Sequence, residues 1–506
     1  MATIDKKEHD SLSVRSDEEK GSHSPKDTSS DVEFAAFGTS VQFSKQEESA
    51  LVRKFDLRIM PVVTILYLSN FIDRTNVGNA KVAGLATDLK LVGYQYNIGL
   101  SVFYIAYALA EIPSNLVLKS AGGNRWLPVI IVAFGFITFI TAWVKNFTGF
   151  IVVRVLLGIA EGGTMPGIAY YLSTYYKRHE LVLRIGIFVA ASSLSGAFGG
   201  LLATALLKIP QIKHLPHGQW RAIFLVEGLI TIALGIAAFF LLPASPEKTP
   251  FLSDRERVIA TERLRVETAG LNRTEKTDKK LVWRAFTSVN NWLCGLGFLL
   301  CNIPTQGISL FMPTLLHGMG YSPIQSQLRS VPPYVVACTW SVFVAYSSYR
   351  TGRRGMWVLI SAPIGLAGAA ILVGTGHKQT DYAGLFLLAI GVFPLGPLFL
   401  TWANNNAAPH TTRAVSSAMV VSIGTMGPIV SSWVYLPMDE PRYIKGNSVL
   451  IGSFAGLIIS TCCLILYNIH ENKARAAGRR DHRLEGADEA TIANLGHLHP
   501  RFRYTL

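Results

Sequence analysis

Long apolar runs constrain this chain more than any other feature of its sequence. A run of about 18 or more apolar residues is long enough to cross the hydrocarbon core of a bilayer as an α-helix. Twelve such runs are present, with edges defined to within a few residues: about 57–79, 96–118, 126–144, 147–172, 184–207, 221–242, 288–313, 331–349, 356–374, 383–403, 414–436 and 448–468. The sequence therefore predicts an all-α membrane protein with twelve transmembrane helices.

The charge of the chain supports this prediction. Only 16% of the 506 residues are charged, against about 25% in soluble proteins, yet the net charge is +14. A soluble nucleic-acid-binding protein would explain the basic charge but not the apolar runs. In a membrane protein, Lys and Arg residues held on the cytoplasmic side account for both features. We therefore expect a lipid bilayer, and no nucleic acid, as the partner.

One long polar segment divides the chain into two sets of six spans. This arrangement is typical of transporters built from two halves, which bind their substrate between the halves near the membrane midplane. The predicted domains are a disordered cytoplasmic tail (1–56), a six-helix bundle (57–243), a cytoplasmic central loop (244–287), a second six-helix bundle (288–469) and a cytoplasmic C-terminal tail (470–506).

The distribution of basic residues predicts the orientation. If the N-terminus is cytoplasmic, most of the 47 Lys and Arg residues lie inside, and the short loops with Lys177 and with Arg353 agree. We therefore predict a multi-pass protein with both termini in the cytoplasm.

The sequence contains no recognisable catalytic set. The five cysteines all lie in apolar runs without metal-ligand spacing, and no nucleophile with a base and no phosphate-binding glycine loop is evident. We expect neither an enzyme nor a metal or cofactor.

Ionisable residues inside the predicted spans are the best candidates for function. Asp73 and Arg74 lie in the first span, and Arg154 and Glu161 in the fourth. Each costs at least about 2.5 kcal/mol near the bilayer centre, so it is usually turned toward a cavity or a partner. Helix lengths place Asp73 and Arg154 at similar depths. Arginines that grip a carboxylate and acids that exchange a proton predict an organic anion coupled to protons; the alternative is that the four residues form purely structural ion pairs.

Other polar residues extend this candidate site. Asn76 is three residues from Asp73 on the same helix, and Tyr107 shares a face of the second span with Glu111. For Glu111 a structural role is equally compatible with the sequence, and for Glu227 it is favoured. The second half contributes hydrogen-bonding and aromatic candidates for substrate selectivity, although Asn at a helix end is more often a cap: Gln306, Trp402 and Asn405.

Several passages carry a family resemblance. They are "RKFDLRIMPVVTILYLSNFIDRTNVGNAKVAGL", "YALAEIPSN", "RVLLGIAEGGTMPG", "GQWRAIFLVEGLITIALG", "PEKTPFLSDRER" and the terminal "FRYTL". The chain resembles the major facilitator superfamily, specifically the fungal allantoate, nicotinate and pantothenate permease branch of its anion:cation symporters. The resemblance implies two pseudo-symmetric six-helix bundles, alternating access, a monomer and proton-driven carboxylate uptake.

The resemblance also assigns roles to residues. Gly158 and Gly162, with Arg154, match a structural motif of the fourth helix. Asp73 and Glu161 match positions that handle protons, whereas Arg74, Arg154 and Tyr107 match positions that bind the substrate anion.

These observations lead to one main hypothesis. We expect a plasma-membrane symporter that imports a small organic carboxylate, such as a nicotinate-like vitamin anion, with protons. The alternatives are an exporter of an acidic secondary metabolite or toxin and a non-transporting nutrient sensor, for which the Ser-rich residues 11–30 are the only indication.

Overall fold

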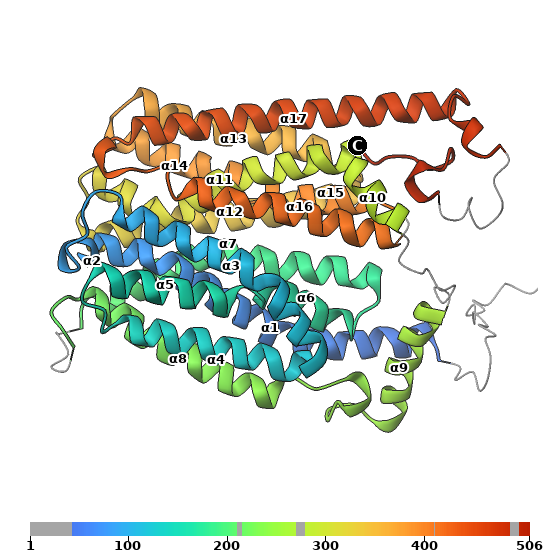
Figure 1. Cartoon of the computed structure of the whole chain (residues 1–506), viewed down its shortest axis with the longest axis horizontal. Helices are drawn as coiled ribbons and strands as arrows, with labels where there is room; N and C mark the ends of the chain where they lie inside the picture. The colour runs from blue at the N-terminus through green and yellow to red at the C-terminus, as the bar shows by residue number, and fades with distance from the viewer. Residues whose placement is uncertain (1–42, 210–214, 270–278, 409, 486–494) are drawn as a thin grey trace, which may run out of the picture.

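Helices running along one common axis dominate the computed structural model, which describes residues 43–209, 215–269, 279–408, 410–485 and 495–506 (Figure 1). The first part of the chain forms α1 (Lys45–Val82), the short α2 (Leu85–Asp88), α3 (Gln95–Ala121), α4 (Gly123–Thr141), α5 (Phe147–Glu161), α6 (Thr164–Ser173), α7 (Arg178–Leu206) and α8 (Trp220–Leu241).

The connection and the second part follow along the chain. The connection holds a 3-10 turn (Pro246–Lys248), α9 (Asp254–Ala269) and α10 (Lys279–Thr287). The second part forms α11 (Val289–Gly318), α12 (Pro323–Thr351), α13 (Arg354–Gly374), α14 (Lys378–Val392), α15 (Leu395–Asn405), α16 (His410–Ser431) and α17 (Ile444–Ala476). Further 3-10 turns lie at Pro437–Asp439, Asp481–Arg483 and Gly496–Leu498.

Most of these helices are long and apolar enough to cross a membrane. Within the described ranges, nine helices or helix pairs meet that condition; α7 and α16 contain the shorter apolar stretches Leu194–Leu206 and Val415–Ser431. Leu109, Leu116 and Phe240 are among the exposed large side chains, at 74%, 67% and 84% exposure. Such an apolar outer surface suits contact with lipid rather than water.

Two of the predicted spans are interrupted rather than continuous. The fourth span breaks at Gly162 and Gly163 into α5 and α6, and the tenth breaks at Phe393 and Pro394 into α14 and α15. Proline has no backbone N–H to donate to the preceding turn. Each break falls inside a single apolar run of the sequence, so the runs alone did not reveal it.

The helices also extend beyond the predicted spans. Residues 45–56 were predicted to belong to a disordered tail, but α1 begins at Lys45. Ser44 accepts a hydrogen bond from the Glu47 backbone N–H, and the Glu47 side chain accepts one from the Ser44 N–H. This reciprocal capping box satisfies donors that a helix start otherwise leaves open.

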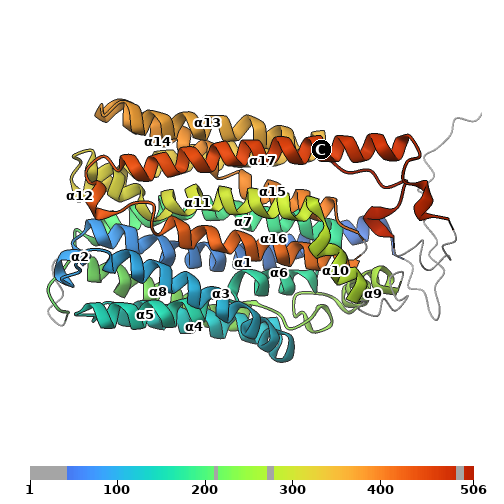
Figure 2. The same cartoon turned by 45° about the horizontal axis from the view of Figure 1, so that its top comes forward.

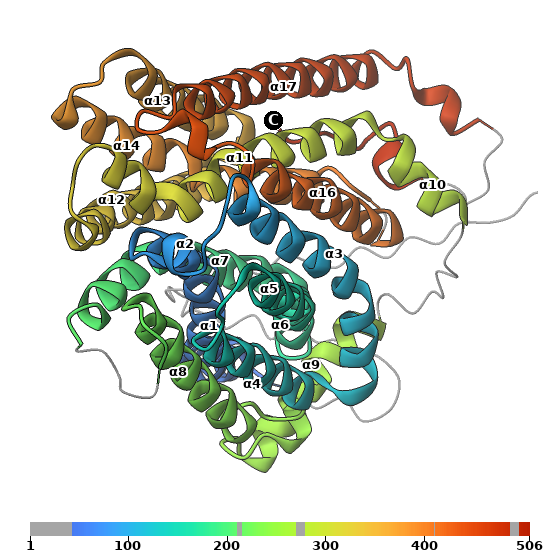
Figure 3. The ribbon, with the colours of Figure 1, turned by 60° about the vertical axis from the view of Figure 1, so that its left-hand side comes forward.

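The two parts of the chain form two helix groups that contact each other. Helices α1 to α8 lie together, as do α11 to α17 (Figures 1 and 3). Contacts between the groups, which we call the first and second halves, join α1 to α11, α3 to α16 and α7 to α12. Figure 2 shows α9, α10 and the last described residues at the same end of the helices. We call this the loop end, and the opposite end the closed end.

The closed end takes its name from contacts that join the two halves. The Asn97 side chain at the start of α3 donates to the carbonyl oxygens of Ser432 and Tyr435, at 2.6 and 3.3 Å. Gln327 of α12 donates to the Asn79 carbonyl of α1 at 3.3 Å. These side-chain to backbone hydrogen bonds hold the halves together at this end.

Candidate functional site

A cavity of about 130 Å³ lies between the two halves. Its lining comes from α1, α3 and α6 on one side and from α11, α15 and α16 on the other: Tyr67, Arg74, Tyr104, Tyr107, Glu111, Met165, Pro166, Phe298, Asn302, Leu400, Val421, Gly424, Thr425 and Pro428. The charged lining residues belong to the first half, whereas the second half supplies apolar and uncharged polar groups. A small substrate between the halves is the arrangement that alternating access requires.

Arg74 is the cation of this cavity and forms a buried ion pair. Its Nε donates to Oε2 of Glu161 on α5 at 2.7 Å, and the side chains are 10% and 0% exposed. The guanidinium also lies over the Tyr107 ring, 4.6 Å from the centroid. The other Glu161 oxygen, Oε1, has no hydrogen-bond partner. The pairing thus joins arginine and acid from different helices and leaves one carboxylate oxygen unused.

Asp73 lies behind the cavity wall, against α8. Thr231 donates to Asp73 Oδ2 at 3.4 Å and is itself hydrogen-bonded to Ser69 at 2.9 Å. The residue is 2% exposed, and its Oδ1 has no partner. Asp73 is therefore held by one long hydrogen bond and forms no direct ion pair with a described residue.

Glu227 of α8 is a second buried acid beside α1. It accepts a hydrogen bond from the Asn76 side chain, whereas its Oε1 has no partner. Asn79 in turn donates to Asn76 Oδ1 at 3.2 Å. The sequence favoured a structural role for Glu227. A single acid in an apolar run does not show which side chains will surround it. Asn76 does not line the cavity and contacts this acid instead.

Arg154 of α5 is buried, and the charges of Glu161 and Asp73 act on it without a direct ion pair. The residue is 3% exposed, and its guanidinium carbon lies 5.3 Å from the centroid of the Phe150 ring. Its Nη2 has no hydrogen-bond partner, and the structure gives the side chain no ion pair with any described residue. A buried arginine of this kind has donors available for an anion.

Gln306, in the second half, contacts the cavity lining of the first half through one hydrogen bond. Its Oε1 accepts from the Tyr104 hydroxyl at 3.0 Å, so a side chain of α11 is joined to a cavity-lining residue of α3. Gln306 itself is 8% exposed and lies beside the cavity rather than in its lining.

Gly158 and Gly162 set the distance between α5 and α3. A Cβ on Gly158 would lie 2.3 Å from the Phe103 carbonyl oxygen, and one on Gly162 would lie 2.5 Å from that of Tyr107. Only glycine permits this backbone approach. The two glycines therefore hold Tyr107 against the helix that carries Arg154.

Trp402 and Asn405 are not brought to the cavity. Trp402 is fully buried at the loop end, and its indole N–H donates to the Thr505 carbonyl at 2.8 Å. Asn405 is exposed at the end of α15. The sequence did not predict that this end of α15 binds the C-terminal residues of the same chain. The partners are backbone groups, which every residue carries, so no sequence motif marks them.

Asn406 is the centre of that C-terminal contact. Its Oδ1 accepts from the Thr505 backbone N–H at 2.8 Å and from the Thr505 hydroxyl at 2.9 Å, and its Nδ2 donates to the Thr505 carbonyl and to Asn290, both at 3.2 Å. His497 Nδ1 lies 2.7 Å from the Ala408 carbonyl, and burial, together with the Arg284 charge, lowers the pKa of this imidazole. Residues 495–506 are thus fixed to α15 and α17.

We expect the substitution Asn406→Ala to lower stability by about 2 kcal/mol, because it leaves buried donors and acceptors unpaired. Thermal unfolding of the purified protein in detergent, with proteolysis of the C-terminal residues, measures the effect. The matched control is Asn405→Ala, an exposed neighbour with no described hydrogen bond. Equal unfolding temperatures for the two variants would contradict the anchoring role of Asn406.

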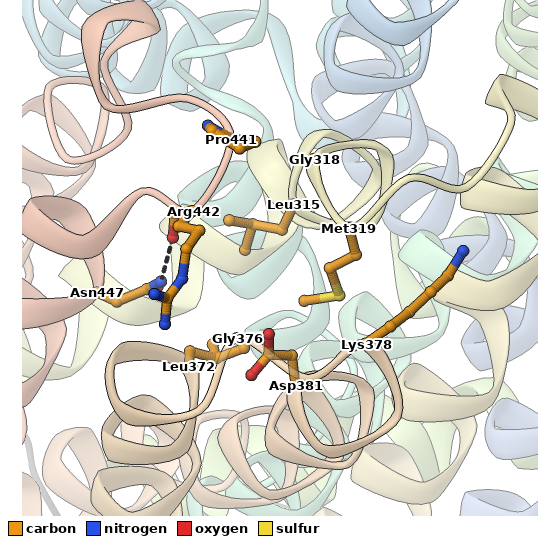
Figure 4. Close-up of a pocket in the computed structure, with 10 residues that line it drawn as sticks. All are labelled: Leu315, Gly318, Met319, Leu372, Gly376, Lys378, Asp381, Pro441, Arg442 and Asn447. Atoms are coloured by element: carbon orange, nitrogen blue, oxygen red, sulfur yellow. Dashed lines mark hydrogen bonds between the residues drawn. The ribbon is translucent and has the colours of Figure 1, made fainter.

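A second cavity, of about 220 Å³, lies at the closed end (Figure 4). It is lined by residues of the second half alone, including Lys378, Asp381 and Arg442. Figure 4 shows the Lys378 ammonium pointing away from the other lining side chains. Because the first half contributes nothing to this cavity, it does not lie on a path between the halves.

Metal binding finds no support in the arrangement of the side chains. Within the described ranges, no group of three or more His, Cys, Asp or Glu residues is placed to hold a metal ion. The candidate site comprises Arg74, Glu161 and Arg154, with the buried acids Asp73 and Glu227 nearby.

Comparison with known proteins places the chain among transporters. The family model described as Major Facilitator Superfamily matches residues 63–432. An uncharacterized transporter of Schizosaccharomyces pombe is 34% identical over 89% of this chain and 92% of its own length. An MFS-type transporter of Penicillium expansum is 32% identical (92% of each chain), and the high-affinity nicotinic acid transporter of Saccharomyces cerevisiae is 30% identical (90% of this chain, 85% of that protein).

Solved structures share the fold. A bacterial homolog of the human lysosomal transporter Spinster, in an inward-facing conformation, superposes with a TM-score of 0.62 at 16% identity, covering 84% of this chain and 97% of that one. A D-xylose-proton symporter gives a TM-score of 0.61 at 14% identity, covering 81% and 97%. These likenesses confirm the predicted all-α fold of twelve membrane helices in two bundles.

Proposed function

Because this chain belongs to the major facilitator superfamily and is therefore a multi-pass membrane transporter of a small molecule rather than an enzyme, we propose that it imports a small organic carboxylate together with protons. The observation that carries the proposal is the pair of arginines at membrane depth, Arg74 in the cavity wall and Arg154, whose buried Nη2 has no hydrogen-bond partner. Cations at membrane depth are costly and are retained where they bind anions. The relative that transports nicotinic acid supports a carboxylate of this size.

The proposal includes a place and an orientation. We place the protein in the plasma membrane as a monomer of the anion:cation symporter branch, with both termini and the loop end in the cytoplasm. The closed end then faces outward, so contacts such as Asn97 to Ser432 separate the cavity from the external medium. The basic loops of the sequence favour this orientation.

The ion pair between Arg74 and Glu161 offers a coupling step. Protonation of Glu161 removes its charge and frees Arg74, whose guanidinium then binds the substrate carboxylate. Release of substrate and proton to the cytoplasm restores the 2.7 Å pair, the arrangement seen here. Asp73, buried without a direct ion pair, is the second proposed proton carrier. Anion and proton therefore favour the same conformational change.

Uptake of labelled nicotinate, pantothenate and allantoate into cells that express the protein tests this function. We expect uptake of at least one of them to rise as external pH falls. Asp73→Asn should reduce proton-driven accumulation by more than tenfold, since the residue can no longer carry a proton; each tenfold corresponds to about 1.4 kcal/mol.

The matched control is Asp381→Asn, a buried acid of the second half that lies outside the central cavity and accepts from Thr375 at 2.5 Å. Uptake by this variant should stay close to that of the wild type. Uptake that is independent of pH and unaffected by Asp73→Asn would contradict proton coupling through Asp73. Faster efflux than uptake of a labelled acid would favour the exporter.

A further inference from the structure

Lys81, near the end of α1, places an ammonium between the two halves at the closed end. Its Nζ lies 4.8 Å from the centroid of the Tyr96 ring and 5.6 Å from that of Phe311. Nζ is buried and has no hydrogen-bond partner. The faces of aromatic rings attract a cation, but they satisfy none of its three N–H donors. This ammonium is therefore free to take an acceptor.

The groups around the Lys81 ammonium come from opposite halves. Tyr96 belongs to α3 and donates its hydroxyl to the Val77 carbonyl at 3.2 Å, which fixes the ring within the first half. Phe311 belongs to α11, and the carboxylate whose charge acts on Lys81 is Glu440, in the loop before α17. Separation of the halves at this end would leave Lys81 with Tyr96 and remove the other two.

Phe311 and Glu440 together supply the chemistry of an aromatic carboxylate. One presents a ring at the ammonium, packed edge-to-face on Tyr96 with centroids 6.3 Å apart. The other presents a carboxylate, held by the Tyr443 hydroxyl at 2.6 Å. Once the halves separate, a small aromatic acid offers Lys81 both a ring and a carboxylate acceptor in one molecule.

Aromatic rings connect this position with the central site. The Tyr96 ring stacks on Phe150, with centroids 6.4 Å apart and planes at 11°. The Phe150 ring also contacts Arg154, whose Nη2 has no hydrogen-bond partner. Lys81 and Arg154 are thus two cations along one wall of the first half, between the closed end and Arg74.

We propose that Lys81, Tyr96 and Arg154 form an outer binding site for a small aromatic carboxylate, uncovered when the closed end opens. The inference rests on the proposed function, since it assumes inward transport of an anion. The substrate carboxylate supplies the acceptor that Lys81 Nζ lacks, and the substrate ring takes the place of Phe311. The anion then passes along Arg154 to Arg74.

Kinetics of labelled nicotinate uptake test the outer site. Lys81→Met keeps the length of the side chain and removes its charge, so we expect KM to rise about tenfold with maximal uptake within about twofold of wild type. Lys81→Arg should restore most of the affinity. For pantothenate, which has no aromatic ring, the rise should be smaller if the wild type carries it.

Lys378→Met is the matched control. The Lys378 ammonium also lies over a tyrosine ring at the closed end, 3.6 Å from the Tyr321 centroid, but within the second half. This variant should leave KM unchanged. An unchanged KM in Lys81→Met, with normal wild-type uptake, would overturn the outer site alone. Absence of carboxylate uptake by the wild type would overturn the proposed function and this inference with it.

Labelling gives a second readout that does not depend on how well Lys81→Met transports. Lys81→Cys in intact cells should react with an externally added anionic thiol reagent, and nicotinate should slow that reaction. Lack of reaction, or a reaction that nicotinate leaves unchanged, would also overturn the outer site. The wild-type protein treated with the same reagent corrects for its five own cysteines.

Discussion

Replacing Arg74 by Gln is expected to abolish carboxylate uptake and to destabilise the protein by about 3–5 kcal/mol, because it leaves Glu161 as an uncompensated buried charge. Glu161 is fully buried, and Arg74 is its only described ion-pair partner, at 2.7 Å. Protonation of Glu161 would recover part of this stability at low pH. Thermal unfolding of the purified variant and uptake into cells measure the two effects separately.

The double substitution Arg74→Gln with Glu161→Gln distinguishes stability from transport. Two neutral amides remove both charges, so most of the lost stability should return. Uptake should not return, since the cavity has lost both its cation and its proposed proton carrier. A double variant as unstable as the single one would show that the charge of Glu161 is not the source of the loss.

Arg184→Gln is a matched control for the loss of an ion pair. Arg184 forms two hydrogen bonds with Asp56 at the loop end, at 2.9 and 2.7 Å, but Asp56 is 36% exposed. Water compensates a partly exposed carboxylate, so the expected cost is about 1 kcal/mol or less. If Arg184→Gln lost as much stability as Arg74→Gln, burial of the remaining carboxylate would not explain the difference expected between the two variants.

The sequence was sufficient to identify the charged residues of the site but not their partners. Charge in an apolar run is costly wherever it occurs, so Asp73, Arg74, Arg154 and Glu161 stood out by composition alone. Which acid meets which arginine depends on the rotation of each helix about its axis, which packing decides. That rotation brought Glu161 to Arg74 and left Arg154 without a direct ion pair.

The same reasoning explains the residues of the second half. Trp402 and Asn405 were candidates because polar and aromatic side chains at a helix end suggested a selective surface. The helix end instead receives Thr505, about a hundred residues later in the chain. Such pairing depends on which distant segment packs against the helix end in the folded chain. The local sequence around the helix end does not determine that segment.

Gly158→Ala is expected to reduce uptake more than tenfold and to cost about 3 kcal/mol or more of stability, at the upper end of the range for overpacked helices. The added methyl group would lie 2.3 Å from a backbone oxygen, that of Phe103, which cannot rotate away as a side chain would. Helix α3 must therefore move away from α5, and Tyr107 moves with it, away from Arg74 and Arg154. A displacement of about 1 Å is enough to cost two orders of magnitude where groups must meet a substrate.

Gly452→Ala in α17 makes the same change where a Cβ would meet nothing within 4 Å. Alanine has the higher helix propensity, by about 1 kcal/mol, so this control should be neutral or stabilising. Surface expression, thermal unfolding and uptake are compared for both variants. If Gly158→Ala matched Gly452→Ala in all three, the close approach of α3 to α5 would not be what holds Tyr107 in the site. Because Gly158 carries no functional group, a loss confined to Gly158→Ala would show that transport depends on the spacing of two helices as well as on the charges between them.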